Sequence, residues 1–382
     1  MDRNFLLGGL SLALAWDWTQ TLTLIFGGCC SNALTLEQLT LTNPHAGSLI
    51  TFAQFLFITL HGLPKFVKFT PYPRLKPRQI SILPYLAQVV LFYLVSLLNN
   101  AAFAYKIPMP VHIVFRSGGL IINMVMGWLL QGRRYPARQI ISVLVITSGV
   151  ALTTLSAVTP RSGQMKASST ASPTDIRLYL TGISILFVAL VFSSILGIVQ
   201  DLTYTAHRKR VAEQPQQAQI NQGEPWQESM FYLHFLSMPM FLLMRQDLAS
   251  QFESLWLSPS IHLSLPPTLS SIPKISTLST PNSLNLPSGM FILLLNTITQ
   301  LVCVAGVHRL TSRVSSLTVT LVLVVRKAVS LLISVFLFSD RYDQMDLRAK
   351  AMMLGGAGMV FVGTLAYSVV AKKGSAEKAK KD

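Results

Sequence analysis

Long apolar runs recur along the whole 382-residue chain and decide its fold class. A helix that crosses a bilayer needs about 20 mostly apolar residues. Ten segments meet that requirement: 19–40, 46–66, 80–103, 108–130, 137–158, 177–201, 228–246, 287–308, 314–338 and 349–371. Only 12% of the residues are charged, against about 25% in an ordinary soluble domain. Because so few charges cannot cover a water-facing surface, the sequence predicts an all-α polytopic membrane protein with ten transmembrane helices.

The spacing of these spans predicts two five-helix repeats, at 19–158 and 177–371. Residues 1–18 are predicted to form an uncleaved interfacial or helix-extending segment, because Asp17 follows their apolar run directly and no small-residue cleavage pattern is apparent. Biased composition predicts loops or disordered linkers without a fold of their own. They are the lumenal loop 159–176, the connection 203–227 and the long loop 247–286, and residues 372–382 are predicted to form a cytosolic basic tail.

Two further predictions concern the cysteines and the seventh span. Cys29, Cys30 and Cys303 all lie inside apolar runs, so they are predicted to be free thiols packed among helices. The span 228–246 is the weakest of the ten, because Pro239 interrupts a short apolar run. It can still cross, since neighbouring helices satisfy the backbone group that a proline frees.

The distribution of positive charge predicts the orientation. The net charge is +16, but the basic residues lie in short loops between apolar runs, which argues against nucleic-acid binding. With a cytosolic N-terminus, 19 of the 31 Lys and Arg residues face the cytosol and nine face the other side. The positive-inside rule therefore predicts cytosolic termini. Lys378 and Lys380 near the C-terminus resemble a dilysine signal for retrieval to the endoplasmic reticulum, or form a basic tail on anionic lipid.

Three cations fall inside the predicted spans: Arg116 in the fourth, and Arg326 and Lys327 in the ninth. Each costs at least about 2.5 kcal/mol at the bilayer centre, so a functional role is the default interpretation. The fourth and ninth spans are equivalent positions in two five-helix repeats. This is the pattern that inverted repeats with a binding site near the midplane would produce.

Helical spacing places each cation among polar residues. Residues on one face of the ninth span are Ser316, Thr320, Lys327, Ser330 and Ser334, and those on one face of the fourth are His112, Arg116 and Asn123. If these two stripes face one another, they form a site for an anion such as a diphosphate. The alternatives are hydroxyls bonded to their own helix, and helix packing, above all for His112. Arg326 lies to one side of the stripe.

Further polar residues within or near the spans are candidates for substrate contacts. Glu37 could pair with a site cation, carry a proton or accept sugar hydroxyls. The side chains of Asn99, Asn100, Asn296 and Gln300 can donate and accept, which suits a uracil edge or an N-acetyl group. Such residues also hold helices together. No spacing typical of a metal site or cofactor motif is present, so none is predicted.

Several strings of residues resemble the nucleotide-sugar transporters of the drug/metabolite transporter superfamily. The branch that they resemble is that of UDP-xylose/UDP-N-acetylglucosamine transporters, which includes the fungal endoplasmic-reticulum UDP-N-acetylglucosamine transporters. The strings run in family order across nearly the whole chain. They are FGGCCSN at 26–32, Leu36-Glu37, TFAQFLFI at 51–58, Asn99-Asn100, MPVHIVFRS at 109–117, NTITQ at 296–300, SLTVT at 316–320 and Arg326-Lys327.

The resemblance implies ten helices in two inverted five-helix repeats, and exchange of a cytosolic nucleotide sugar for a lumenal nucleoside monophosphate. It implies phosphate contacts from Arg116 and Lys327, with Arg326 as a further candidate. It also implies nucleoside or sugar contacts from Asn99, Asn100, Asn296 and Gln300. The expected partners are a UDP-sugar, UMP and the bilayer of the endoplasmic reticulum or Golgi, with a homodimer as an option.

Two other functions fit a polytopic membrane protein. A transporter of another organic anion, such as a sugar phosphate, would use the same buried cations. A membrane glycosyl- or acyltransferase would need acids or a histidine base at a water-facing edge. The lumenal acids Asp340, Asp343 and Asp346 are the nearest approach to such a site. Their proximity to Arg341 and Arg348 gives them a simpler role in charge balance, so an enzyme is not expected.

Overall fold

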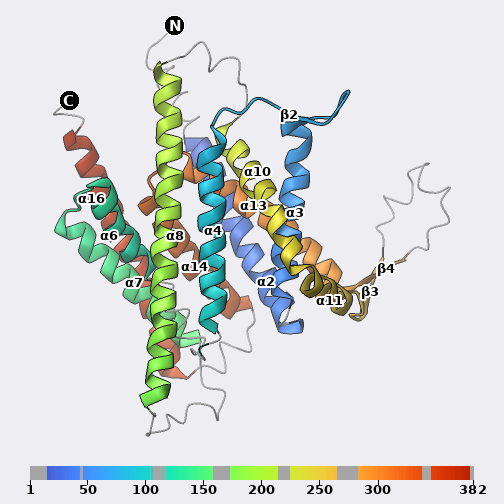
Figure 1. Ribbon diagram of the computed structural model, residues 1–382. Helices are drawn as coiled ribbons and strands as arrows, with labels where there is room; N and C mark the ends of the chain where they lie inside the picture. Colours follow the sequence, from blue (N-terminus) through green and yellow to red (C-terminus); the bar gives the residue numbers. More distant parts are fainter. Residues whose placement is uncertain are drawn as a thin grey trace. The chain divides into compact units, whose positions relative to one another are not determined.

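The computed structural model describes residues 15–43, 46–103, 105, 115, 118–157, 173–213, 224–264, 283–337 and 346–378. Within these residues seven helices are long and apolar enough to cross a membrane (Figure 1). They are α3 (Gly47–Phe66), α4 (Ile82–Phe103), α7 (Ala137–Ala157), α8 (Pro173–Glu213), α13 (Ser288–Thr311), α14 (Ser316–Leu337) and α16 (Leu347–Lys378). The polytopic helical class is therefore confirmed, and the number of ten spans stays a prediction.

The chain folds into two compact units. The first unit contains residues 1–76 and 230–306, and the second contains 77–229 and 307–382. Each unit takes helices from both predicted repeats, so these boundaries are not those of 19–158 and 177–371. The division into two repeats stays a prediction at this stage.

The first predicted span is helical throughout residues 15–42, but it changes pitch in the middle. A π-helical turn, η1 (Leu24–Gly28), leads into α2 (Cys29–Thr42). Gly28 lies against α13, where an added Cβ would come within 2.7 Å of the Cys303 backbone nitrogen. The missing side chain thus allows the first and eighth spans to touch.

At this contact, Cys29 and Cys303 form a disulfide, with their Cα atoms 4.5 Å apart. The prediction of three free thiols is wrong for this pair and holds for Cys30, which is buried. The two partners are 274 residues apart in the chain. Their proximity depends on the packing of the first and eighth spans, which apolar composition does not encode.

The disulfide predicts the labelling of cysteines by a maleimide. In the denatured, unreduced protein one cysteine, Cys30, is expected to react. After reduction, all three are expected to react, and intact-mass spectrometry counts the adducts. Three adducts without reduction would contradict the disulfide. A Cys30→Ala variant, which is expected to show none before reduction, is the control.

The seventh predicted span is divided at its proline. Helix α10 (Pro225–Ser237) ends at the 3-10 helix η2 (Met238–Met244), which contains Pro239, and α11 (Arg245–Trp256) follows. Strands β3 (Ser260–Ser264) and β4 (Ser283–Pro287) then pair antiparallel, with Ser260 opposite Pro287 and Ser264 opposite Ser283. The prediction of a disordered linker at 247–286 is therefore wrong at both ends. Helix α11 forms there because apolar side chains such as the buried Leu255 pack against α3 and α13.

Helix α8 is longer than the predicted span. It runs for 41 residues, about 60 Å at 1.5 Å per residue, whereas the hydrocarbon core is about 30 Å thick. Its last turns contain residues 203–213, which the composition predicted to belong to the connection 203–227. The Arg208 guanidinium donates to the Ser312 carbonyl at 2.7 Å, and Arg133 pairs with Asp201 at 2.7 Å. These contacts support the helix beyond its apolar part.

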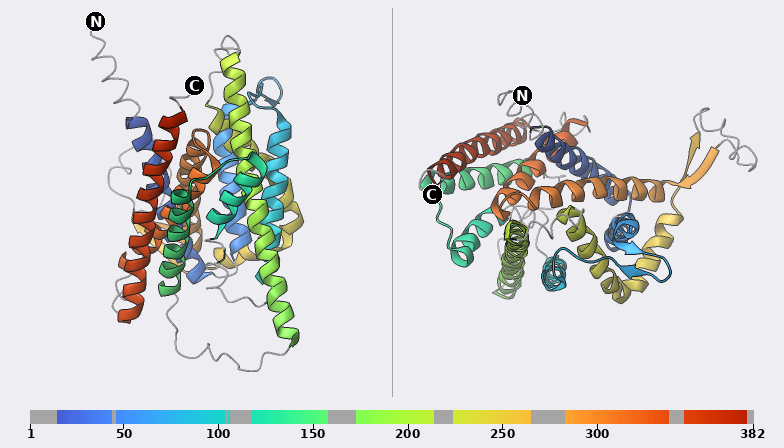
Figure 2. Two further views of the ribbon diagram at one scale, coloured as in Figure 1. Left: turned by 90° about the vertical axis from the view of Figure 1, so that its left-hand side faces the viewer. Right: turned by 90° about the horizontal axis from the view of Figure 1, so that it is seen from above.

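The last span packs along the fifth through glycines. Figure 2 shows α16 beside α7 in both views. A Cβ added to Gly356 would lie 2.6 Å from the Gly149 carbonyl oxygen and 2.5 Å from the Thr153 hydroxyl. At Gly355 and Gly358 an added Cβ would meet nothing within 4 Å. Of the glycines on this helix, Gly356 and the similarly crowded Gly363 therefore serve packing within the fold.

This difference predicts opposite results for neighbouring substitutions. We expect Gly356→Ala to lower the free energy of unfolding by about 1–3 kcal/mol, because the methyl group would overlap backbone atoms of α7. Gly358→Ala, two residues away, is the matched control, and higher helix propensity should leave its stability equal or slightly higher. Thermal unfolding in detergent measures both. Equal stability of the two variants would contradict the close contact.

The second unit also contains α6 (Gly119–Gln131), which covers the second half of the fourth predicted span. A short antiparallel pair, β1 (Val67–Lys68) and β2 (Arg74–Leu75), follows α3 in the first unit. In the second unit α6 contacts α8 and α14, and α4 lies along α8. These contacts place the predicted polar stripe of α14 against other helices.

Candidate functional site

The two predicted stripes meet at Asn123, which is 4% exposed. Its amide nitrogen donates to the Thr320 hydroxyl at 2.7 Å. Its amide oxygen accepts from the hydroxyls of Ser194 at 3.3 Å and Ser316 at 3.4 Å. One buried amide thus joins α6, α8 and α14. The Thr320 hydroxyl also donates to the Ser316 carbonyl of its own helix at 2.8 Å. It therefore bonds both within α14 and to the polar stripe of α6.

The cations of α14 lie beyond this contact. Lys327 is exposed and Arg326 is half-buried, whereas Val324, Val325 and Ala328 around them are buried. Ser330, one turn after Lys327, is buried at 8% exposure. The ammonium group therefore emerges from a helix that is otherwise packed against its neighbours. The other two members of the predicted anion site, Arg116 and His112, lie outside the described residues.

A second polar network lies in the first unit around Asn296, which has no exposed surface. Its amide oxygen accepts from the Gln54 side chain at 2.7 Å, and its amide nitrogen donates to the Thr35 hydroxyl at 3.0 Å. The Asn32 side chain donates to the Asn296 backbone carbonyl at 3.0 Å. Because neighbouring residues use its donors and acceptors, this arrangement favours a role in joining the first, second and eighth spans.

The other predicted site residues are dispersed. Glu37 is half-buried on α2, and Gln300 is half-buried on α13. The Asn99 amide donates to the Val95 carbonyl one turn earlier, at 2.8 Å. Asn100 lies on α4 and Lys378 ends α16, but their side chains are outside the described part of the chain, as is all of Lys380. The structure therefore joins Asn123 to Thr320 and leaves the remaining site residues as sequence predictions.

Buried acids form two sites that the sequence argument missed. Among the acids of the spans, Glu37 was considered from the sequence and Asp201 on α8 was not, although Asp201 is 4% exposed and pairs with Arg133. Tyr135 lies in the same loop as Arg133, between α6 and α7. Burial raises the pKa of Tyr135, which the nearby Arg133 partly opposes, so the phenol stays protonated at neutral pH. The apolar run stops near Asp201, and this hid its burial.

Glu228, at 2% exposure, is the second missed acid. Its carboxylate accepts from two consecutive backbone nitrogens, those of Gln79 at 2.8 Å and Ile80 at 3.1 Å. It also accepts from the Tyr85 hydroxyl at 3.1 Å. The side chain thus fastens the chain that enters α4 to the start of α10. Its position at the first residue of a predicted span gave no signal of this role.

These features define a class of protein: a polytopic membrane protein whose helices are joined by polar side chains and one of whose spans carries two cations. The chain matches the UAA transporter family over residues 18–371 and belongs to that family. The sequence-based resemblance to nucleotide-sugar transporters is thereby confirmed.

Three relatives illustrate the range of the family. The UDP-N-acetylglucosamine transporter YEA4 of Saccharomyces cerevisiae is 35% identical over 93% of this chain and 95% of its own length. The endoplasmic reticulum GDP-fucose transporter of Drosophila melanogaster is 35% identical over 91% of this chain and 88% of its own length. The UDP-xylose and UDP-N-acetylglucosamine transporter of Danio rerio is 34% identical over 91% and 92%. These relatives are named as transporters, in agreement with the expectation that the protein is not an enzyme.

A solved crystal structure agrees in fold. It covers 93% of this chain and 98% of its own chain, with a TM-score of 0.53 and 13% sequence identity. At this identity the likeness concerns the course of the chain alone.

Proposed function

We propose that the protein is an antiporter that moves UDP-N-acetylglucosamine from the cytosol into the lumen of the endoplasmic reticulum or Golgi in exchange for UMP. The observation that carries the proposal is the contact of Asn123 with Thr320, which brings together the two predicted spans whose sequences contain the three cations. Membership in the family and the names of the relatives supply the substrate class.

The helix contacts support the division into two inverted five-helix repeats. Equivalent spans touch one another in three cases: α3 with the α10–η2 segment, α6 with α14, and α7 with α16. In addition α4, the third span, packs on α8, the sixth span. The equivalent pair, spans eight and one, is joined by the disulfide between Cys29 and Cys303. Exchanging each span with the one five places later therefore reproduces these particular contacts, as a twofold repeat would.

The same arrangement relates the two predicted phosphate ligands. Arg116 precedes Asn123 by seven residues, and Lys327 follows Thr320 by seven. On α14 the step from Thr320 to Lys327 is close to two helical turns, or about 10 Å along the axis. In ten alternating spans the fourth and ninth run in opposite directions, so both steps lead toward the same side of the membrane from the Asn123–Thr320 contact. We infer that both cations serve one diphosphate, with Arg326 as a further contact.

The transport cycle that we propose is rocking around this site. Two cations offset the charge of the diphosphate, and binding must stay weak enough for release on each side. With both termini cytosolic, the positive-inside rule orients the helices. Glu37, His112, Asn99, Asn100 and Gln300 are then candidates for contact with the nucleoside or sugar, whereas we assign Asn296 mainly to helix packing.

A substrate panel in proteoliposomes tests the proposal. Vesicles with the purified protein are preloaded with UMP, GMP or buffer, and uptake of labelled UDP-N-acetylglucosamine, UDP-xylose and GDP-fucose is measured. We expect UDP-N-acetylglucosamine uptake to require internal UMP and external UMP to compete with it. Faster uptake of GDP-fucose against GMP would instead favour the specificity named for the Drosophila relative. Transport of sugar phosphate without any nucleotide sugar would replace the proposal by the organic-anion alternative.

A further inference from the structure

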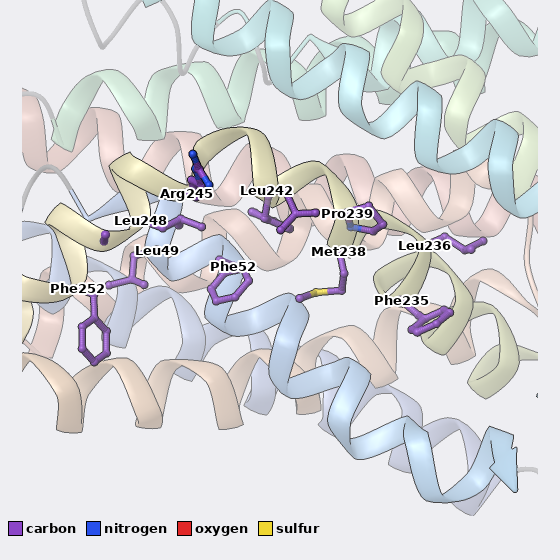
Figure 3. Close-up of a pocket in the computed structure, with 12 residues that line it drawn as sticks. Leu49, Phe52, Phe235, Leu236, Met238, Pro239, Leu242, Arg245, Leu248 and Phe252 are labelled. Carbon is purple, nitrogen blue, oxygen red and sulfur yellow. The ribbon is translucent and has the colours of Figure 1, made fainter. Parts of the chain in front are cut away.

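An apolar groove of about 860 Å³ lies in the first unit, between α3 and the α10–η2–α11 segment (Figure 3). Eleven of its twelve lining residues are apolar, among them Phe52, Met238 and Leu248. Arg245 is the twelfth. Its volume falls within the range of about 300–1,000 Å³ that is usual for small-molecule sites.

The groove follows from the break in the seventh span. A 3-10 helix has three residues per turn, so side chains at positions i and i+3 stand in line. Pro239 and Leu242 in η2 and Arg245 at the start of α11 have this spacing, and all three line the groove. The 3-10 helix thus places two apolar side chains and one cation along the same wall.

No residue that the structure describes neutralises the charge of Arg245. Its side chain is exposed, and within the described part of the chain its guanidinium takes part in no hydrogen bond or ion pair. Asp247 is the nearest acid in sequence, but it does not line the groove, and two residues along a helix point to different faces. The groove therefore offers a positive charge without a counter-ion of its own.

The position of the groove relative to the membrane indicates which ligand could neutralise Arg245. Both α3 and residues 228–246 are predicted spans, so the groove opens at the depth of the acyl chains, and Arg245 lies at the end of its span. Helix α11 continues from this point with exposed Phe252 and Trp256, whose rings stack at 5.9 Å. Aromatic residues of this kind are enriched where the membrane meets water.

We propose that this groove is a binding site for an anionic phospholipid. An acyl chain lies along Phe52, Met238 and Leu248, and the phosphate is bound by Arg245. The groove matches such a lipid in polarity and charge. Its wall is almost wholly apolar, like an acyl chain, and Arg245 lies where the phosphate of the headgroup would be. A lipid held there would support the interrupted seventh span from the side.

Photolabelling with a phospholipid tests this proposal. The full-length protein in mixed micelles is incubated with phosphatidylinositol that carries a diazirine in one acyl chain, and labelled peptides are mapped by mass spectrometry. Phosphatidylcholine with the same chain is the zwitterionic comparison. We expect phosphatidylinositol to label residues of α3 and of 235–252 more efficiently than phosphatidylcholine.

Two variants and one control decide the outcome. Arg245→Gln should reduce labelling by phosphatidylinositol about fivefold, since an exposed ion pair contributes up to about 1 kcal/mol to binding. Ala249→Phe, which fills the groove, should abolish labelling by both lipids, and Arg348→Gln on the exposed start of α16 should change neither.

Unchanged labelling of the Arg245→Gln variant, or equal labelling by the two lipids in the unmodified protein, would overturn the proposal. If neither lipid labels the groove and Ala249→Phe lowers the oligomeric state in light scattering, a second copy covers this face instead. Retained thermal unfolding of each variant establishes that folding is intact.

Discussion

Lys327→Ala is expected to reduce exchange of UDP-N-acetylglucosamine for UMP by about 100-fold while leaving the melting temperature nearly unchanged. Charge-assisted contacts to phosphate contribute about 1.5–3 kcal/mol each, and each 1.4 kcal/mol is a factor of ten in binding. The side chain is exposed, so its removal opens no cavity in the packing of α14. The loss should therefore appear in transport and not in stability.

Three controls make this result specific. Lys209→Ala removes an exposed lysine from the end of α8 and should leave exchange unchanged. Arg116→Ala should resemble Lys327→Ala, because we propose that both cations bind the same diphosphate. Lys327→Arg should retain part of the activity. Full exchange by the Lys327→Ala and Arg116→Ala variants in proteoliposomes would remove the basis for the phosphate assignment.

Glu228→Ala is expected to be the most destabilising single substitution that we describe. It would leave the Gln79 and Ile80 backbone nitrogens and the Tyr85 hydroxyl without their acceptor. Each buried donor that loses its partner costs about 1–3 kcal/mol. We expect a total of about 3 kcal/mol and a fall of about 5–10 °C in the apparent melting temperature.

The matched control is Glu224→Ala, one turn earlier, where the carboxylate is exposed. It should unfold at the temperature of the unmodified protein. Glu228→Gln keeps one acceptor oxygen and should fall between the two. If thermal unfolding of Glu228→Ala equals that of Glu224→Ala, the carboxylate does not hold the entry to α4.

Much of the site argument was accessible from residue spacing. A stripe at helical period predicted that Asn123 and Thr320 share surfaces with the cations of their spans, and the structure brings these two side chains together. This inference succeeds because helix periodicity is a local constraint. The cost of placing a charge in lipid pointed to a functional role for Arg326 and Lys327, which stays a prediction.

The roles of other polar residues could be found only from the tertiary structure. Whether Asn296 binds a ligand or joins helices depends on whether Gln54 and Thr35 reach it, and these residues come from two other spans. The partners of Asp201 and Glu228 likewise lie far away in sequence. A lone carboxylate near the end of an apolar run looks the same in sequence whether it is solvated or buried.

By itself, then, the amino-acid sequence determined the polytopic membrane class and the family, because hydropathy and periodicity act over one helix at a time. Only the tertiary structure decided the disulfide between Cys29 and Cys303, the glycine contact of α16 with α7 and the groove beside Pro239. Each of these depends on which surfaces of separate helices meet. That choice rests on shape and on hydrogen-bond partners brought together from distant parts of the chain.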